Sequence, residues 1–155
     1  MTQKVNFKKL DTRAVTPRYG SSAAAGADLY AILDGPLTLA AGQTVLVHTG
    51  LAMEIPAGFV GLVCARSGLA TKRGLAPANK VGVIDADYRG EIMVALHNHG
   101  TEAQTIDHGE RVAQLMLVPY LTADYTEVEE LSDTVRGEGG FGSTGTFVDE
   151  NGEVI

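Results

Sequence analysis

Short apolar segments alternate with turn residues along most of the chain. The segments are rich in β-branched residues, which favour strands. Breaks such as Asp34-Gly35-Pro36 and Asp107-His108-Gly109 separate them and carry residues typical of tight turns. Many short strands at this spacing indicate an all-β sandwich or barrel. We predict strands near 3–10, 27–32, 43–48, 50–55, 59–65, 81–84, 91–97, 103–106 and 111–119.

One short helix interrupts the strand pattern. Ser67 is a residue type that caps helix N-termini, and Gly74 is typical of the position after a helix end. The sequence therefore predicts a helix over residues 68–73 with Ser67 as its cap. Arg66, Ser67 and the unpaired N–H groups of this helix start also form a candidate anion site.

The segment 81–92 carries the most specific chemical pattern. Apolar residues at both ends predict two strands, and the turn between Gly82 and Gly90 contains two carboxylates and Tyr88. A hairpin with strands this apolar normally has a short polar turn such as Asn-Gly, without functional side chains. We expect Asp85, directly after the first strand, to be partly buried and held at a fixed angle as a candidate catalytic base.

Composition limits the classes of function. The 155 residues predict one domain, and the formal charge of −7 argues against a nucleic-acid or anionic-membrane surface. A single cysteine, Cys64, excludes an intrachain disulfide and indicates a reducing compartment. The N-terminus has no apolar core of signal-peptide length. We expect a cytoplasmic protein.

The last part of the chain changes character. After Leu121 the sequence becomes acidic, and residues 136–145 contain five glycines with single Arg, Phe, Ser and Thr residues among them. A glycine-rich end is normally disordered. Those four side chains nevertheless suit phosphate binding and ring stacking. We interpret residues 1–135 as the folded domain and residues 136–155 as an arm that closes over a ligand.

Several other polar residues are interpreted as structural. Arg111 and Glu110 are expected to form ion pairs, and Lys72 and Arg73 to be a solvated helix end. His97 and His99 share a face of a strand. Because the sequence offers no third metal ligand nearby, they are interpreted as surface histidines.

Five segments between residues 25 and 145 together resemble the trimeric deoxyuridine triphosphatase (dUTPase) family. They read, in order, Ala-Gly-x-Asp-Leu, Arg-Ser-Gly-Leu, Gly-x-Ile-Asp-x-Asp-Tyr-x-Gly, Gly-Glu-Arg-Val-Ala-Gln-Leu and Arg-Gly-x-Gly-Gly-Phe-Gly-Ser-Thr-Gly. The resemblance implies a β jelly roll, a homotrimer whose sites are shared between subunits, and Mg²⁺-dependent hydrolysis of dUTP to dUMP and pyrophosphate. Ala65 is one departure, since the family often has proline there.

The resemblance also implies roles for individual residues. Asp85 matches the general base that activates a water for in-line attack on the α-phosphate, and Tyr88 matches the residue that packs against the deoxyribose. The uracil pocket is matched by Asn79, Val83, Ile84, Asp85 and Met93. The groups near the phosphates are matched by Arg66, Ser67, Gly68 and Gln114. The arm is matched by Arg136, Phe141, Gly142, Ser143 and Thr144. Asp28 matches a carboxylate that acts on Mg²⁺ through water.

The sequence disfavours three rival functions. The related dCTP deaminases need a glutamate at the position of Ala95, which disfavours that reaction. A dUTP-sensing regulator would be favoured by loss of the base or of the glycine-rich arm, and both are present. A broader nucleotide pyrophosphatase is disfavoured by Tyr88 and the tight hairpin.

Overall fold

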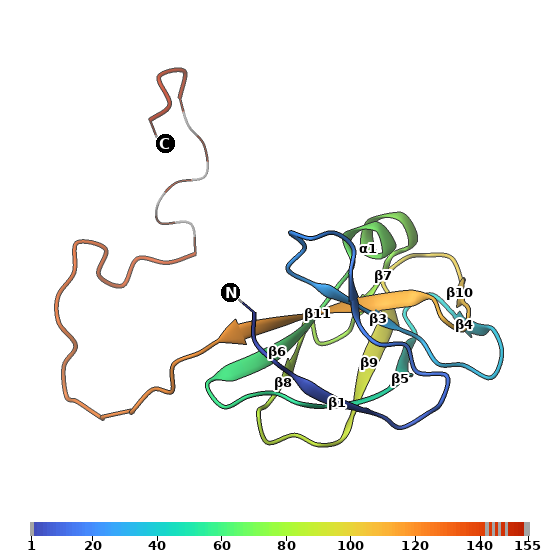
Figure 1. Ribbon diagram of the computed structural model, residues 1–155. Coiled ribbons are helices and arrows are strands. Elements are labelled where there is room, and N and C mark those ends of the chain that lie inside the picture. The colour runs from blue at the N-terminus through green and yellow to red at the C-terminus, as the bar shows by residue number, and fades with distance from the viewer. Residues whose placement is uncertain (1, 142, 144, 146, 148, 154–155) are drawn as a thin grey trace. The chain divides into compact units, whose positions relative to one another are not determined.

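The computed structural model describes residues 2–141, 143, 145, 147 and 149–153, and it divides into two compact units, Met1–Leu121 and Thr122–Ile155. The strands and the helix assigned among the described residues all lie in the first unit (Figure 1). In chain order they are β1 (Asn6–Lys9), β2 (Arg18–Tyr19), β3 (Ala27–Tyr30), β4 (Leu37–Leu39), β5 (Thr44–Glu54), β6 (Phe59–Cys64), α1 (Ser67–Arg73), β7 (Leu75–Pro77), β8 (Val81–Ile84), β9 (Glu91–Asn98), β10 (Gln104–Ile106) and β11 (Arg111–Pro119).

Two antiparallel sheets form the first unit, in the orders β1-β5-β9-β7 and β2-β3-β11-β6-β8, with β10 and β4 as a small third sheet. The alternation along β9 shows how they pack, because Ile92, Val94 and Leu96 are buried while Met93 between them points outward. Leu29 of β3 and Val112 of β11 are fully buried in the same core cluster. The predicted all-β fold, a jelly-roll-like sandwich with one short helix, is confirmed.

Strand β5 differs from the prediction. The segments near 43–48 and 50–55 are one strand of 11 residues, with an irregular register between His48 and Ala52. Gly50 lies in this irregularity with a φ of 65°, a conformation that glycine adopts without strain. The glycine therefore produces a bulge within a strand, where the sequence had suggested a break between two strands.

Three strands were not predicted at all. Strands β2, β4 and β7 contain two or three residues each, which is too short for a pattern of alternation to be visible. Each pairs with a longer strand or with another short one, so tertiary pairing rather than local preference defines them.

Helix α1 begins one residue earlier than predicted. Arg66 occupies the N-cap position with no side-chain cap, so the prediction that Ser67 caps the helix was wrong. The predicted end is confirmed: Gly74 is left-handed, with φ 65°, and its N–H donates to the carbonyl of Ala70. The helix is therefore held mainly at its C-terminal end.

The second unit contains local turns. Asp149 Oδ1 accepts hydrogen bonds from the N–H groups of Asn151 (2.8 Å) and Glu153 (2.9 Å), which lower the pKa of the Asp149 carboxyl. Across both units, the described residues include no helix long and apolar enough to cross a bilayer.

Candidate functional site

A cavity of about 310 Å³ lies between the hairpin strands β8 and β9 and the adjacent part of β5. We call it the hairpin pocket. It brings together six residues that the resemblance had placed in one site: Asn79, Val83, Ile84, Asp85, Tyr88 and Met93. Sequence reasoning missed the remaining lining residues, which are Leu46, Val63, Pro77, Gly82, Glu91, Val94 and Ala95.

Asp85 lies at the end of β8, where the chain enters the turn. Its carbonyl accepts a hydrogen bond from the N–H of Tyr88 (3.2 Å), which closes the turn. The side chain is exposed, so the expected partial burial is not found in the single chain. Within the described part of the chain, no hydrogen bond or ion pair engages its carboxylate. Asp85 is thus presented to the pocket by backbone geometry alone.

Asn79 is placed at the pocket by the turn before β8. Lys80 has a φ of 65°, and the N–H of Val81 donates to the carbonyl of Asn79 (2.7 Å). The Asn79 amide lies against Gly82, where an added Cβ would be 3.3 Å from Nδ2 and 3.2 Å from the Val63 Cβ. Because Gly82 has no side chain, the Asn79 amide can lie over the strand.

The ring of Tyr88 packs on the turn itself. Its hydroxyl donates to the carbonyl of Glu91 (2.9 Å). A Cβ on Gly90 would lie 2.4 Å from that hydroxyl oxygen and 2.6 Å from Cζ, so the ring rests directly on the glycine backbone. Arg89 donates to the carbonyls of Ala86 (2.7 Å) and Tyr88 (3.0 Å) and closes the turn from its other side.

A second group of predicted residues meets around a buried carboxylate on β3. Asp28 accepts hydrogen bonds from Arg66 Nε (2.7 Å) and from Arg111 (3.2 Å), and its side chain is 12% exposed. Gln114 of β11 donates to the carbonyl of Ala65 (2.8 Å). We call Asp28, Arg66, Arg111 and Gln114 the Asp28 cluster.

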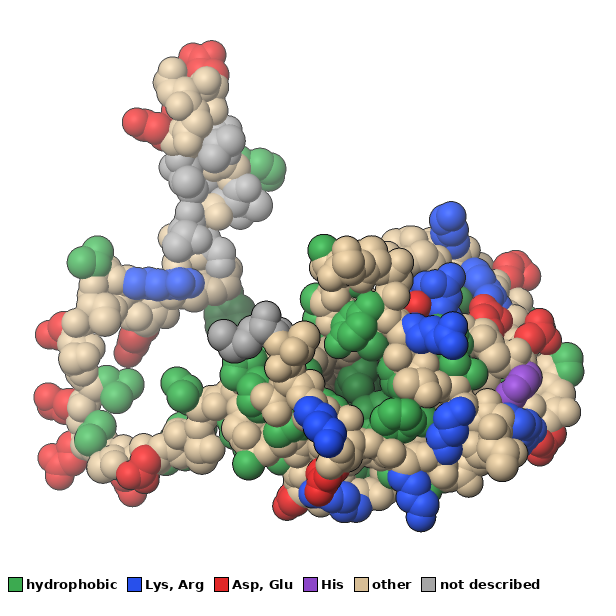
Figure 2. Space-filling view, in the orientation of Figure 1, with side chains coloured by type: hydrophobic (Ala, Val, Ile, Leu, Met, Phe, Trp, Pro, Cys, Tyr) green, Lys and Arg blue, Asp and Glu red, His purple; other side chains and the backbone are tan. Residues whose placement is uncertain are grey.

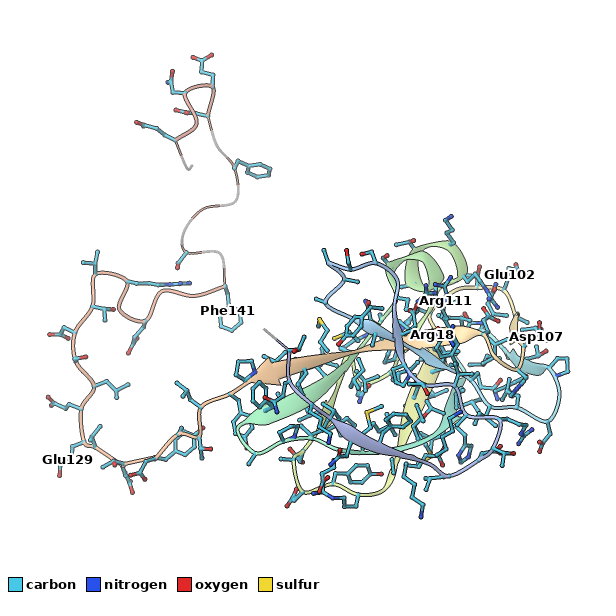
Figure 3. All side chains as sticks on the ribbon, in the orientation of Figure 1. Arg18, Glu102, Asp107, Arg111, Glu129 and Phe141 are labelled. Carbon is cyan, nitrogen blue, oxygen red and sulfur yellow. The ribbon has the colours of Figure 1, made fainter. Side chains whose placement is uncertain are left out.

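The surroundings of the Asp28 cluster are basic. Arg18 is the strand partner of Asp28, and directly opposed residues project from the same face of a sheet. Figure 2 shows Lys and Arg side chains on the face over β3, β11 and the end of α1, with Asp and Glu side chains beside them, and Figure 3 labels Arg18 and Arg111 there. An anion is favoured at this face despite the negative charge of the whole chain.

The predicted helix-end residues have different roles. Arg73 donates to Gln104 Oε1 (3.1 Å) and contacts Glu110 and the Thr105 carbonyl, so its interpretation as a solvated helix end was wrong. Glu110 and Arg111 do form ion pairs, with Arg73 and Asp28 respectively. These contacts join α1 to β10 and to the start of β11.

His97 of β9 and His99, directly after the strand, lie edge to face, with ring centroids 4.3 Å apart. His97 Nδ1 is 2.7 Å from Thr44 Oγ1. Loss of hydration, followed by the charges of Lys80 and His97, lowers the pKa of His99. Across the described residues, no three His, Cys, Asp or Glu side chains are grouped as a metal site would need.

Asp85 and Arg66 lie towards opposite ends of one ladder, whereas Val63 and Gly82 of the hairpin pocket lie near its Arg66 end. In the pairing of β6 with β8, Gly61 is opposite Ile84 and Cys64 is opposite Val81. Asp85 follows the first pair, whereas Arg66 follows the second. About six residues along β6 separate them, which corresponds to roughly 20 Å in a strand. Asp85 and Arg66 of one chain are therefore well separated along the sheet.

Three predicted arm residues are described, all in the second unit. Arg136 Nε donates to the carbonyl of Gly139 (2.8 Å), and the N–H of Ser143 donates to the carbonyl of Gly140 (3.0 Å). Phe141 is fully exposed and has a positive φ of 47°. Gly142 and Thr144 lie outside the described residues.

Comparison with known proteins identifies one family. The dUTPase family model matches residues 12–145. The deoxyuridine 5'-triphosphate nucleotidohydrolase of Desulfitobacterium hafniense is 49% identical over 143 residues, which cover 92% of this chain and 95% of that protein. The dUTPase of Staphylococcus bacteriophage 80alpha with dUpNHpp has a TM-score of 0.85 at 29% identity, covering 94% of this chain and all of that one. A dUTPase mutant from phage phi11 of S. aureus, with a structural Mg(II) ion, shares the fold at a TM-score of 0.76 and 24% identity, covering 84% of this chain and all of that one.

Proposed function

The chain belongs to the dUTPase family, and we propose that it hydrolyses dUTP to dUMP and pyrophosphate, with Asp85 as the base that activates the attacking water. One observation carries the proposal: the hairpin pocket gathers Asp85, Asn79 and Tyr88 at one cavity. An exposed carboxylate at a fixed backbone position can accept a proton from a water held beside the α-phosphate. The water then attacks in line, and pyrophosphate leaves.

Uracil recognition is assigned to the backbone of β8. This strand is the edge of its sheet, with β6 on one side only. The backbone N–H and C=O groups of Val83, Ile84 and Asp85 that do not pair with β6 are assigned to the donors and acceptors of the base. The Asn79 amide adds a side-chain partner, and Met93 supplies an apolar wall. Readout of this kind discriminates strongly, because a wrong base leaves buried groups unpaired.

The phosphates are assigned to the Asp28 cluster and the start of α1. Arg66 uses Nε on Asp28, while its terminal nitrogens make no hydrogen bond within the described part of the chain. Those nitrogens, the Ser67 hydroxyl, the open backbone at Gly68 and the Gln114 amide are suited to phosphate oxygens. Arg136, Phe141, Gly142, Ser143 and Thr144 of the arm complete the proposed set.

Magnesium fits this donor set only through water. Mg²⁺ prefers oxygen ligands and retains several of its waters. Asp28 offers carboxylate oxygens, but Arg66 and Arg111 already engage one oxygen each. Asp28 would therefore act on the hydrated ion indirectly. When bound, the ion neutralises charge on the triphosphate.

We propose a homotrimer with shared sites, as the family resemblance implies, and the separation of Asp85 from Arg66 supports the sharing. Asp85 and Arg66 lie roughly 20 Å apart along the same ladder. In this proposal a complete site combines Asp85 and the hairpin pocket of one copy with the Asp28 cluster of another. We propose that the enzyme limits uracil incorporation into DNA and supplies dUMP. A cytoplasmic location stays a prediction.

Phosphorus NMR of products from dUTP and Mg²⁺ tests the reaction. We expect pyrophosphate and dUMP from the wild type and unchanged dUTP with Asp85→Asn. Orthophosphate and dUDP would show cleavage at the γ-phosphate and contradict attack at the α-phosphate. Binding of dUTP without cleavage would favour a sensor instead.

A further inference from the structure

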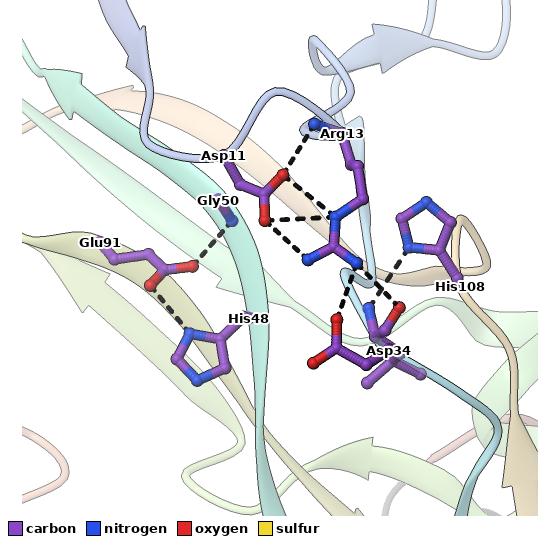
Figure 4. Close-up of polar contacts among 8 residues, drawn as sticks. Asp11, Arg13, Asp34, His48, Gly50, Glu91 and His108 are labelled. Atoms are coloured by element: carbon purple, nitrogen blue, oxygen red, sulfur yellow. Dashed lines mark hydrogen bonds and ion pairs between the residues drawn. The ribbon is translucent and has the colours of Figure 1, made fainter.

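The bulge in β5 holds the strand that returns from the hairpin turn. The β5–β9 register is regular up to the pair His48–Met93 and resumes at Ala52–Glu91. The Glu91 carboxylate fills this interval. It accepts a hydrogen bond from the N–H of Gly50 (2.7 Å) and lies 2.8 Å from His48 Nδ1 (Figure 4). Glu91 is thus tied to β5 by its side chain.

A second contact from the bulge holds the next residue of β9. The buried Thr49 hydroxyl donates to the carbonyl of Ile92 (2.5 Å). The Glu91 side chain is only 20% exposed, so water competes weakly for its two partners. The first two residues of β9 are therefore fixed by the bulge rather than by ordinary ladder pairing alone.

This anchoring reaches Tyr88 through the backbone of the turn. The Tyr88 hydroxyl donates to the carbonyl of Glu91, and its ring lies on Gly90. Both supports of the Tyr88 ring are therefore linked to the bulge, because the bulge holds Glu91 and Gly90 directly precedes Glu91. A shift of Glu91 would therefore move the ring of Tyr88.

We propose that Glu91 is a positioning residue for sugar selectivity. Its carboxylate fixes the start of β9 on β5, and its carbonyl then fixes Tyr88 at the place where a 2′-hydroxyl would have to fit. The inference rests on the proposed function, in which Tyr88 packs against the deoxyribose. Without the anchor, the ring can retreat and admit a ribonucleotide.

Steady-state kinetics with dUTP and UTP measure this selectivity. We expect Glu91→Ala to lower the ratio of kcat/KM for dUTP to that for UTP by about tenfold or more, since displacements of about 1 Å can change rates by roughly 10²-fold. Glu91→Gln keeps an oxygen for the Gly50 N–H and an amide beside His48, so it should retain more of the ratio than Glu91→Ala. If Glu91→Ala does not fold, His48→Ala removes one of the two anchors and provides the same readout.

Glu110→Ala is the matched control. Glu110 also pairs with a cation, Arg73, and accepts a backbone N–H from Asp107 (3.2 Å), and its side chain is 28% exposed. Its loss should lower the melting temperature without changing the dUTP-to-UTP ratio. A comparable fall of the ratio in Glu110→Ala would show general loosening and overturn the proposal.

A double-mutant cycle separates positioning from direct contact. If Glu91 acts through Tyr88, Glu91→Ala should change the ratio little in a Tyr88→Ala background. Additive effects, or an unchanged ratio in Glu91→Ala, would contradict the inference even if the wild type cleaves dUTP and rejects UTP. A wild type that does not cleave dUTP would instead refute the proposed function.

Discussion

The hairpin pocket and the Asp28 cluster differ in how far their polar groups are already engaged. In the pocket, Asp85 is exposed, and no hydrogen bond or ion pair to its carboxylate occurs among the described residues. In the cluster, both oxygens of Asp28 are bonded to arginines, and the Gln114 amide is bonded to the Ala65 carbonyl. The pocket can receive a ligand without losing internal bonds, whereas the cluster presents groups that are already oriented by their neighbours.

The contrast assigns proton transfer to the hairpin pocket and phosphate binding to the Asp28 cluster. A free carboxylate at the pocket suits proton transfer, since nothing within the described chain competes for it. Arginine held by a buried carboxylate suits recognition of a charged ligand, because its orientation is set before the ligand arrives. The predictions below test this division.

Asp85→Asn should have the largest effect. We expect kcat to fall by about 10²–10⁴-fold, because the amide cannot accept the proton, while dUTP binding is preserved. Single-turnover rates and calorimetric titration with a non-hydrolysable analogue measure the two separately. A variant that lost binding and kept its turnover rate would reverse the assignment of the pocket.

Arg66→Lys should weaken binding more than turnover. Arginine can hold Asp28 with Nε and offer its two terminal nitrogens to phosphate. Lysine has a single side-chain nitrogen and cannot do both. Loss of one hydrogen bond to a charged group corresponds to about 1.5–3 kcal/mol, so KM should rise by roughly tenfold or more. An unchanged KM would show that Arg66 is only the structural partner of Asp28.

Gly26→Ala should perturb the cluster and spare the pocket. An added Cβ would lie 2.4 Å from Gln114 Oε1, so the amide must move and its bond to the Ala65 carbonyl is lost. The free energy of unfolding should fall by about 1 kcal/mol. We expect a lower kcat/KM for dUTP with an unchanged dUTP-to-UTP ratio. A changed ratio would mean that the two regions are not separable.

Asp11→Asn should have the smallest effect and leaves both regions intact. Hydrogen bonds from the Arg13 side chain and N–H lower the pKa of Asp11 to about 2, and Arg13 also bonds Asp34 (Figure 4). A lowered folded-state pKa contributes stability above the unfolded-state value of 3.8, and this is lost as pH falls towards 2. The variant should melt slightly below the wild type at pH 7, and the difference should vanish near pH 2. A difference that persists in acid would contradict this cause.

Local patterns in the sequence predicted the hairpin, but they did not predict the contacts that hold it on β5. The glycines at 82 and 90 and the apolar flanks mark β8, the turn and the start of β9 from sequence alone. The bulge at Gly50 could not be recognised, because its partner Glu91 is 41 residues away. The partial burial expected for Asp85 is not found in the single chain, because the apolar residues of β8 before it do not determine what packs on the turn that follows.

The cluster was predicted only through the family resemblance. Asp28, Arg66 and Gln114 lie on β3, at the cap of α1 and on β11, and their meeting depends on strand order rather than on spacing. Arg73 was misinterpreted because its partners, Gln104 of β10 and Glu110 before β11, are distant from it in sequence. Sequence identifies the residue types, whereas pairing across sheets decides their neighbours.

Mixing two impaired variants tests most directly whether one site combines two copies. Asp85→Asn subunits, which lack the base, and Arg66→Ala subunits, which bind dUTP weakly, are unfolded together, refolded as a mixture and assayed at a low dUTP concentration. If the pocket of one copy works with the Asp28 cluster of another, random assembly restores roughly a quarter of the wild-type sites. Activity of the mixture that equals the average of the two separate variants would show that each chain builds its site alone and would contradict the account.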